Sequence, residues 1–387
     1  MILERIKSLV PISRLANTTK TRISCPFHMS KDLDMSLNHS NNTWRCFGKC
    51  GHGGDVIEWM KFERPELNFN EIIEHLANIA GVSTKPPEER TRILTKAMES
   101  FREELLENQQ AQEFLLTRGI TEETWFKANI GFCNGIPNGI SMKDLKASGL
   151  VTEHNYTYFD KRIVFALHNS AGQIVHLQGR TLGLDLMSDR KYLMLPSETA
   201  LGKFPISHYI YGEEQLSKPI KTAVLCEGIP DALIARQLGV PSFGTIGNQG
   251  FHIHGYKLKD LETLFIIMDN DESSQTKLCV EVHKLQAKMP NTQLKIVYLP
   301  KASKDLNEWY LNTQATPSSF QYLLETSSKL ALEVLIDSWS SNRLMHYQLV
   351  ETLASTNNSN YWFELFSKTT NISIDSIRYL ASVIKGH

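Results

Sequence analysis

The sequence lacks the features that would place the protein in a membrane or outside the cell. Its 387 residues contain no run of about 18 apolar residues, which excludes a membrane-spanning helix. The first residues carry charged side chains where a secretory signal needs an apolar run, so we expect a cytoplasmic protein. The six cysteines are too few for a disulfide scaffold of this length, and there is no internal repeat or low-complexity tract.

The sequence also lacks an excess of charge of either sign. Lys and Arg together number 41 and Asp and Glu 42, which gives a formal net charge of −1. A uniformly basic surface is therefore excluded, and any contact with nucleic acid requires a local concentration of positive charge. Residues 1–50 provide one, because they hold eight basic and three acidic side chains. This excess fits contact with phosphates and exposed bases, or it is only a solvated basic face.

Three of the cysteines lie close together and are accompanied by a histidine. The spacing is Cys25-x2-His28, then 17 residues, then Cys46-x3-Cys50. Two short ligand pairs on turns, brought together by a hairpin, are how a chain forms a closed tetrahedral zinc site. We therefore predict one structural Zn²⁺ held by these four side chains; the alternative is three unrelated cysteines and a stray histidine.

Neighbouring residues of this segment leave further alternatives open. His39 and His52 are substitute ligands for the same metal. Trp44 either packs the small core of the ribbon or stacks on a template base. A helix with apolar residues at three- and four-residue spacing follows over residues 72–79, and Gly81 is its expected end.

The remainder of the chain alternates between recognisable patterns, and its length allows two to four domains. Apolar-rich runs over 162–168 and 173–180 flank Asn169–Gly172, which predicts a β-hairpin. Between 221 and 315, short β-rich runs alternate with helix-period segments, which predicts a parallel, Rossmann-like sheet. We expect an α+β multidomain protein with a zinc ribbon at residues 1–81, a linker at 82–90, a mixed α/β segment at 91–220, the parallel sheet at 221–316 and a helical region at 317–387.

Carboxylates follow three of the predicted strands. Glu227 and Asp231 come after the run 222–226, Asp269 and Asp271 after 263–268, and Asp305 after 294–299. In an open α/β sheet, ligands bind beyond the carboxyl ends of the strands, so these side chains should meet at one edge. Carboxylates that share a small volume need cations, and hard oxygen ligands favour Mg²⁺ or Mn²⁺. The sequence therefore predicts two or more metals and phosphoryl or nucleotidyl transfer.

These motifs resemble those of the DnaG-type DNA primases of bacteria and their phage and plasmid relatives. Cys25-Pro-Phe-His28 and Cys46-Phe-Gly-Lys-Cys50 resemble the CHC2 zinc-binding domain of that family. Glu227-Gly, Asp231 and Asp269-x-Asp271 resemble its Toprim metal site. The start of its polymerase core is similar to Arg118-Gly-Ile-Thr, Arg162-Ile-Val-Phe165, Gly179-Arg180 and Lys191-Tyr-Leu193. The resemblance runs from about Cys25 to Glu308 in the family's motif order.

The resemblance implies a primase that makes short RNA primers on single-stranded DNA from ribonucleoside triphosphates. It implies that Asp231, Asp269, Asp271 and Asp305 bind Mg²⁺ or Mn²⁺, with Glu227 as general base or a further carboxylate. It further implies a bacterial cytoplasm, or a phage or plasmid gene expressed there. The residues that would contact template or nucleotide are Arg162, Arg180, Lys191, Tyr192 and Lys203, although Arg180 could instead form an ordinary surface ion pair.

Other functions stay open on the sequence alone. The same metal site could cleave phosphodiesters, as in a Toprim-type nuclease or nicking enzyme, or the chain could be a non-catalytic replication accessory that binds single-stranded DNA. No Gly-x4-Gly-Lys-[Ser/Thr] motif occurs, so a P-loop helicase motor would have to act in trans. The C-terminal helices either dock such a helicase or cap the core.

Overall fold

The computed structural model describes residues 7–80, 88–183, 190–247, 250–342, 345–356 and 358–385. The chain forms two compact units, one of Met1–Glu88 with Leu201–Lys203 and the other of Glu89–Ala200 with Phe204–His387. Most of the expected linker at 82–90, and the helix end at Gly81, lie outside the described residues. None of the helices in the described ranges combines the length and apolarity that a bilayer crossing needs.

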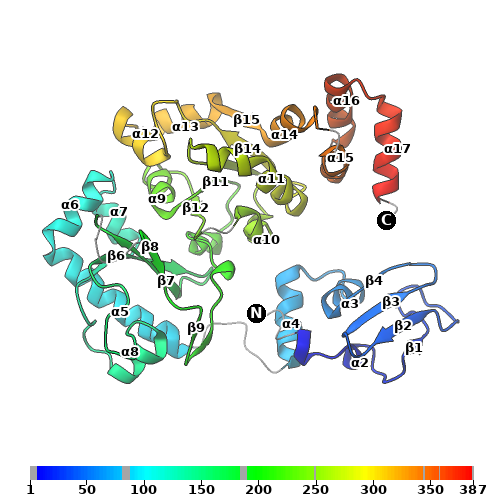
Figure 1. The fold of residues 1–387 in the computed structure, drawn as a ribbon, viewed down its shortest axis with the longest axis horizontal. Helices are drawn as coiled ribbons and strands as arrows, with labels where there is room; N and C mark the ends of the chain where they lie inside the picture. The colour runs from blue at the N-terminus through cyan, green and yellow to red at the C-terminus, as the bar shows by residue number, and fades with distance from the viewer. Residues whose placement is uncertain are drawn as a thin grey trace. The chain divides into compact units, whose positions relative to one another are not determined.

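The first unit is built on a four-stranded antiparallel sheet (Figure 1). Along its central strands apolar and polar residues alternate, so that Met35, Leu37 and Trp44 point to a buried face. The helices α3 and α4 contribute Trp59 and Leu76 to the same core. The elements are α2 (Ile12–Leu15), β1 (Arg22–Ile23), β2 (Met35–Asn38), β3 (Thr43–Cys46), β4 (Gly53–Gly54), α3 (Val56–Glu63) and α4 (Phe69–Ala80).

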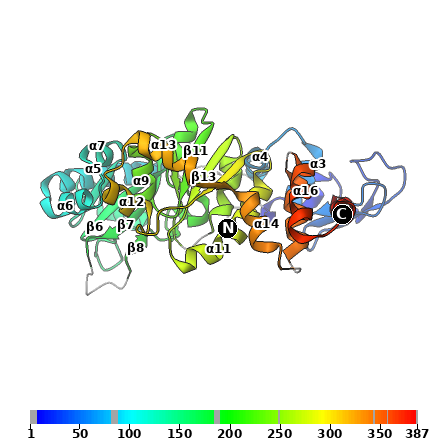
Figure 2. The ribbon, with the colours of Figure 1, turned by 90° about the horizontal axis from the view of Figure 1, so that it is seen from above.

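The second unit begins with helices beside a four-stranded antiparallel sheet, as Figures 1 and 2 show. The predicted hairpin at its centre is confirmed, because residues 162–168 and 174–181 pair as antiparallel strands. In the turn, Oδ1 of Asn169 accepts hydrogen bonds from the N–H groups of Ala171 and Gln173, and Gly172 adopts a φ of +75°. The elements are α5 (Glu88–Glu107), α6 (Gln109–Thr117), α7 (Glu122–Lys127), β5 (Ile130–Cys133), α8 (Met142–Ser148), β6 (Arg162–His168), β7 (Ile174–Thr181) and β8 (Tyr192–Met194).

A five-stranded sheet follows in the order β12-β11-β13-β14-β15, and the predicted parallel arrangement is confirmed for its first four strands. The edge strand β15 is antiparallel, which the sequence did not indicate. The strands are apolar on both faces because helices cover both. Val224 and Cys226 pack against α9, whereas Ala223 and Leu225 pack on the side of α11. The elements are β11 (Thr222–Cys226), α9 (Ile229–Gln237), β12 (Ser242–Gly244), β13 (Thr263–Ile267), α11 (Glu272–Lys288), β14 (Gln293–Val297) and β15 (Ser328–Leu330).

The C-terminal helices pack on this sheet, at the orange and red end of the chain in Figure 1. Leu349, Trp362 and Ile377 belong to the same apolar cluster as Leu264 and Ile266 of β13. The helices therefore cap the core, while a role in docking a helicase stays a prediction. They are α13 (Pro317–Thr326), α14 (Ala331–Trp339), α15 (His346–Ser355), α16 (Ser359–Thr370) and α17 (Ile374–Lys385), and the helix α12 (Leu306–Thr313) precedes them.

Candidate functional site

The four predicted zinc ligands meet at one end of the ribbon. One ligand atom from each of Cys25, His28, Cys46 and Cys50 lies within 4.8 Å of all the others. The Cys25 and Cys50 sulfurs are 3.7 Å apart, and Nδ1 of His28 is 3.8 Å from the Cys46 sulfur. Zinc–sulfur bonds of about 2.3 Å in a tetrahedron require ligand separations of about 3.8 Å. The donor set and its spacing therefore fit a structural Zn²⁺.

A carboxylate that the sequence analysis missed supports this cluster. Oδ2 of Asp34 lies 3.0 Å from Nε2 of His28, and Oδ1 accepts a hydrogen bond of 3.1 Å from the Cys25 N–H. A carboxylate on the far ring nitrogen orients a metal-binding histidine. A side chain at Gly48 would collide with Asp34, since an added Cβ would lie 2.0 Å from Oδ2. Small size at position 48 is thus required for this arrangement.

The open alternatives around the cluster are resolved. Nε2 of His39 faces the Lys20 carbonyl oxygen, and the His52 ring lies 4.7 Å from that of Phe62. Among the described residues, neither histidine belongs to the group of metal-binding atoms. Trp44 is 3% exposed, so it packs the core of the ribbon and does not present a ring for stacking.

The solvent-facing side of the same sheet carries basic and aromatic side chains. Arg22, Ser36 and Arg45 are paired across adjacent strands, and Phe47 follows Arg45 by two residues. Phe47 is 64% exposed, and both guanidinium carbons lie 5.9 Å from its ring centroid. Neither arginine forms an ion pair with a carboxylate in the described part of the chain. This face offers a stacking surface and two cations.

The acidic residues of the second unit gather at the carboxyl ends of the parallel strands. β11 and β13 are paired in register from Thr222–Thr263 to Cys226–Ile267, so the segments that follow them start side by side. Across this edge, the backbone N–H of Asp269 donates a hydrogen bond of 3.3 Å to Oε2 of Glu227. The predicted convergence of these two segments is therefore present.

The third acidic segment reaches the same edge through the helix α12. Asp305 caps this helix, since its Oδ1 accepts a hydrogen bond of 2.7 Å from the Glu308 N–H. The backbone N–H of Asn307 also lies in the first turn, where it has no acceptor within the helix. It donates a hydrogen bond of 3.0 Å to Oδ1 of Asp231. The start of α12 thus holds carboxylates from two segments.

Asn270, between the two predicted metal ligands Asp269 and Asp271, stabilises this edge of the sheet through hydrogen bonds. Its Nδ2 donates hydrogen bonds to the carbonyl oxygens of Leu299, Pro300 and Ser303 at 3.2, 3.3 and 2.9 Å. Its backbone N–H donates to the Lys304 carbonyl at 2.6 Å. Asn270 therefore fixes the loop that leads to Asp305 against the segment after β13.

The electrostatics of the edge show how close the carboxylates are. Burial and the charges of Asp305 and Asp269 raise the pKa of Asp231 to about 7. Burial, with the charges of Glu227, Asp305 and Asp271, raises the pKa of Asp269 to about 6. Keeping these neighbouring carboxylates in their charged forms costs free energy. A bound cation would remove that cost. The donor set, all oxygen, fits Mg²⁺ or Mn²⁺.

Basic and aromatic side chains lie near these carboxylates, since the charges of Asp231 and Asp305 act on Arg180 and that of Asp269 acts on Lys191. Arg180 is only 3% exposed, donates a hydrogen bond of 2.9 Å to the Tyr192 hydroxyl, and lies 5.3 Å from the centroids of both the Tyr192 and Phe114 rings. It forms no ion pair with a described carboxylate, so it is not an ordinary surface pair. Burial and the charges of Arg180 and Arg118 lower the pKa of Lys191. Arg118, which was not among the predicted site residues, therefore belongs to this basic cluster.

The other two predicted basic residues are placed differently. Arg162 is 3% exposed, and its Nη1 donates to the carbonyl oxygens of Arg190 and Lys191 at 3.1 and 3.3 Å. It thereby supports the backbone that carries Lys191. Lys203 lies on β10 (Gly202–Lys203), which groups with the first unit. Contact of either residue with nucleic acid stays a prediction.

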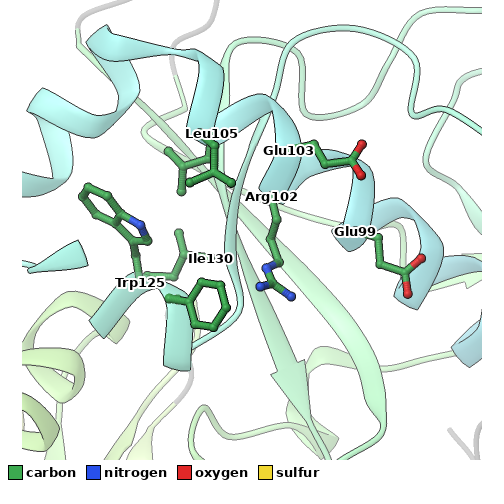
Figure 3. Close-up of a pocket in the computed structure, with 8 residues that line it drawn as sticks. Glu99, Arg102, Glu103, Leu105, Trp125 and Ile130 are labelled. Carbon is green, nitrogen blue, oxygen red and sulfur yellow. The ribbon is translucent and has the colours of Figure 1, made fainter. Parts of the chain in front are cut away.

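A cavity of about 240 Å³ lies elsewhere in the second unit, between α5, α7 and β5 (Figure 3). Its lining combines the apolar Leu105, Trp125 and Ile130 with the charged Glu99 and Arg102. None of the predicted site residues lines it, so it is not part of the candidate site.

Two family descriptions match the chain. "CHC2 zinc finger" matches residues 2–92, and "DNA primase catalytic core, N-terminal domain" matches residues 100–216. The DNA primase of Thermotoga maritima is 26% identical over 268 residues, which cover 62% of this chain and 46% of the relative. The DNA primase of Geobacillus stearothermophilus is 25% identical over 308 residues, covering 71% and 50%. The chain spans about half the length of the curated relatives that it matches.

Solved structures share the fold. The zinc-binding and RNA polymerase domains of the Aquifex aeolicus primase match with a TM-score of 0.63 at 20% identity, covering 97% of this chain and 98% of that one. A DnaG primase catalytic domain bound to single-stranded DNA matches with a TM-score of 0.61 at 18% identity, covering 75% and 98%. The expected arrangement of a zinc ribbon followed by a mixed α/β core is thus confirmed.

Proposed function

We propose that this chain, which belongs to the DnaG-type family of DNA primases, synthesises short RNA primers on single-stranded DNA by metal-dependent nucleotidyl transfer. The observation that carries the proposal is the meeting of Glu227, Asp231, Asp269 and Asp305 at one sheet edge, near a basic and aromatic cluster. A nucleotide polymerase needs this pairing, since carboxylates hold the cations and basic groups hold the phosphates.

The residues divide into roles by their chemistry. Asp269 and Asp271, with Asp231 and Asp305 beside them, would hold two or more Mg²⁺ or Mn²⁺. When bound, such ions lower the pKa of the initiating 3′-hydroxyl and neutralise the pyrophosphate leaving group. Glu227, which already accepts a hydrogen bond from Asp269, would supply a further carboxylate or accept the proton of that hydroxyl.

The basic cluster would bind the phosphates of the ribonucleoside triphosphate and the template. Arg180 is buried and fixed by Tyr192, so its guanidinium is oriented before any ligand arrives. Lys191 lies at the edge of this cluster, on backbone that Arg162 supports. These are the residues that we expect to determine nucleotide affinity.

The zinc unit would contact the template. Its outer sheet face presents Arg22, Arg45 and Phe47, a set suited to phosphates and an unpaired base. The solved relative bound to single-stranded DNA supports DNA as the template. We further propose working boundaries of 1–81 for the zinc domain, 82–90 for the linker, 91–220 for the N-terminal part of the core, 221–316 for the Toprim part and 317–387 for the helical region, with any helicase recruited in trans.

One assay tests the proposed activity. The purified chain is incubated with single-stranded DNA, labelled ribonucleoside triphosphates and Mg²⁺ or Mn²⁺. Short RNA products that disappear in Asp269→Ala, but persist in the exposed control Asp260→Asn, support the primase. Shortened DNA without RNA products would instead identify a nuclease, and DNA binding with neither product would identify an accessory protein.

Metal analysis of Cys46→Ser tests the zinc site, since a zinc content equal to that of the wild type would refute the ligand set.

A further inference from the structure

Asn307 occupies a position between the acidic edge and the basic cluster. It is 3% exposed and is the second residue of α12. Its backbone N–H donates to Asp231, and its side-chain Nδ2 donates to the carbonyl oxygen of Arg118, 189 residues earlier in the chain. Asn307 therefore contacts the carboxylate of Asp231 with its backbone. With its side chain it contacts the turn at Arg118 and Gly119 that follows α6, the Arg118 turn.

The Arg118 turn is held by a second amide as well. Nε2 of Gln237, at the end of α9, donates hydrogen bonds of 3.0 Å to the Gly119 carbonyl and 2.8 Å to the Tyr310 hydroxyl. Its Oε1 accepts a bond of 3.1 Å from the Thr121 N–H. Gly119 has a φ of +69°, and an added Cβ there would lie 2.6 Å from the Tyr310 ring. The turn is thus seated tightly on α9 and α12.

The position of the Arg118 turn affects the basic cluster because Arg118 belongs to that cluster. Its charge lowers the pKa of both Arg180 and Lys191, so its guanidinium lies near theirs. Arg118 also lies 5.9 Å from the Phe114 ring, which Arg180 contacts as well. A shift of the turn would therefore move Arg118 relative to the carboxylates on the sheet edge.

We propose that Asn307 is a positioning residue whose side chain sets the Arg118 turn, and with it nucleotide affinity, and is not a metal ligand. The inference rests on the proposed primer synthesis for its kinetic readout. Asp231 is held by the backbone N–H of Asn307, which survives any side-chain substitution except proline. Loss of the amide should therefore weaken nucleotide binding and spare metal binding.

The test measures the two affinities separately on the full chain. Binding of Mn²⁺ alone and of ATP in the presence of Mn²⁺ is followed by isothermal titration, and KM and kcat by primer synthesis. For Asn307→Ala we expect ATP affinity to fall and KM to rise about five-fold or more, because a buried carbonyl loses its donor. Mn²⁺ affinity and kcat should stay within about two-fold. A metal ligand would give the opposite result, with Mn²⁺ affinity falling.

Two further variants sharpen the test. Asn307→Asp cannot donate to the Arg118 carbonyl, so it should weaken ATP binding as Asn307→Ala does; if it instead binds Mn²⁺ and ATP as tightly as the wild type, the proposal is wrong. In an Arg118→Gln background, Asn307→Ala should add less than about two-fold to the loss, since both act through one turn. Full additivity would show that Asn307 does not act through Arg118.

A matched control separates positioning from general damage. Gln286 is also 3% exposed, and its Nε2 donates to the carbonyls of Met289 and Thr292. Gln286→Ala should leave the ATP affinity unchanged, whereas Gln237→Ala should weaken it. The binding titrations do not depend on turnover. A wild type that makes no primers, with an ATP affinity that still depends on Asn307, would therefore refute primer synthesis and support the positioning role.

Discussion

Nε2 of His28 lies 3.0 Å from Oδ2 of Asp34, while Nδ1 of the same ring lies 3.8 Å from the Cys46 sulfur. The two ring nitrogens thus face opposite partners, one a carboxylate and the other the metal-binding cluster. The carboxylate fixes which nitrogen carries the proton, and through its second oxygen it also binds the Cys25 N–H. Asp34 therefore orients two of the four proposed zinc ligands.

Replacing Asp34 by Asn should weaken zinc binding. The amide cannot stabilise the ring as a carboxylate does, and loss of such a partner costs about 10- to 100-fold in metal affinity. Competition with a chelator of known affinity measures the change. Asp32→Asn is the control, since Asp32 is exposed and carries the same charge. Equal zinc affinity in Asp34→Asn and the wild type would contradict the assigned role.

Phe47→Ala should weaken binding of single-stranded DNA by about 1–3 kcal/mol, because an exposed ring that stacks on a base contributes about that much. The dependence of the affinity on salt should not change, since no charge is removed. Arg22→Gln or Arg45→Gln should instead lower the salt slope by about 0.7. Fluorescence anisotropy of a labelled oligonucleotide at several salt concentrations measures both.

Lys61→Gln is the matched charge control for this face. Lys61 lies on α3, which packs on the buried side of the sheet, and pairs with Glu58 at 2.8 Å. It should change neither the affinity nor the salt slope. If Phe47→Ala binds as tightly as the wild type, the outer face of the ribbon is not where a base stacks.

The positions of the candidate metal-binding residues could be predicted from the sequence because simple geometry places them. Cys25 and His28 form one short pair and Cys46 and Cys50 another, and a hairpin is enough to join them. Glu227 and Asp269 follow parallel strands, whose carboxyl ends meet at one edge whatever the intervening sequence. In both cases the pattern within a few residues determines the outcome.

The residues that support these ligands could not be predicted in the same way. Asn307 reaches a carbonyl 189 residues away, and Asn270 reaches several backbone groups about 30 residues away. No periodicity marks such contacts, since they depend on how loops meet in three dimensions. The sequence also left Trp44 with two roles, which burial decides, and gave no sign that Phe47, next to a buried ligand, would be exposed.

Trp44→Ala should destabilise the zinc unit by about 3–5 kcal/mol, the usual cost of removing a large buried ring. Trp44 contacts Phe27, Trp59 and Phe62, and its Nε1 donates to the Asp55 carbonyl at 3.1 Å. Denaturant unfolding of the zinc-loaded protein measures the change. Phe47→Ala, which removes an exposed ring from the same sheet, should stay within about 0.5 kcal/mol. Similar losses in both variants would contradict the packing role.

The acidic edge should make stability depend on pH and on metal. In the folded protein the pKa values of Asp231 and Asp269 are about 7 and about 6, above the ordinary value of 3.8. Between about pH 4 and pH 7 these two side chains therefore bind more protons in the folded protein than in the unfolded chain. The contribution of these two carboxylates to the free energy of unfolding of the protein without Mg²⁺ or Mn²⁺ should then fall as the pH rises through this window, whereas buried histidines with lowered pKa values, such as His176 and His254, contribute in the opposite direction.

A divalent cation takes the place of those protons, so Mn²⁺ should raise the Tm more at about pH 8 than at about pH 5. Asp231→Asn removes one of the opposed charges while its amide oxygen can still accept the Asn307 N–H. Without Mn²⁺ at about pH 8 it should therefore unfold at a higher temperature than the wild type, and Mn²⁺ should stabilise it less. Asp260→Asn, an exposed carboxylate elsewhere, should behave as the wild type. Equal stabilisation by Mn²⁺ at both pH values would show that these carboxylates do not share a cation.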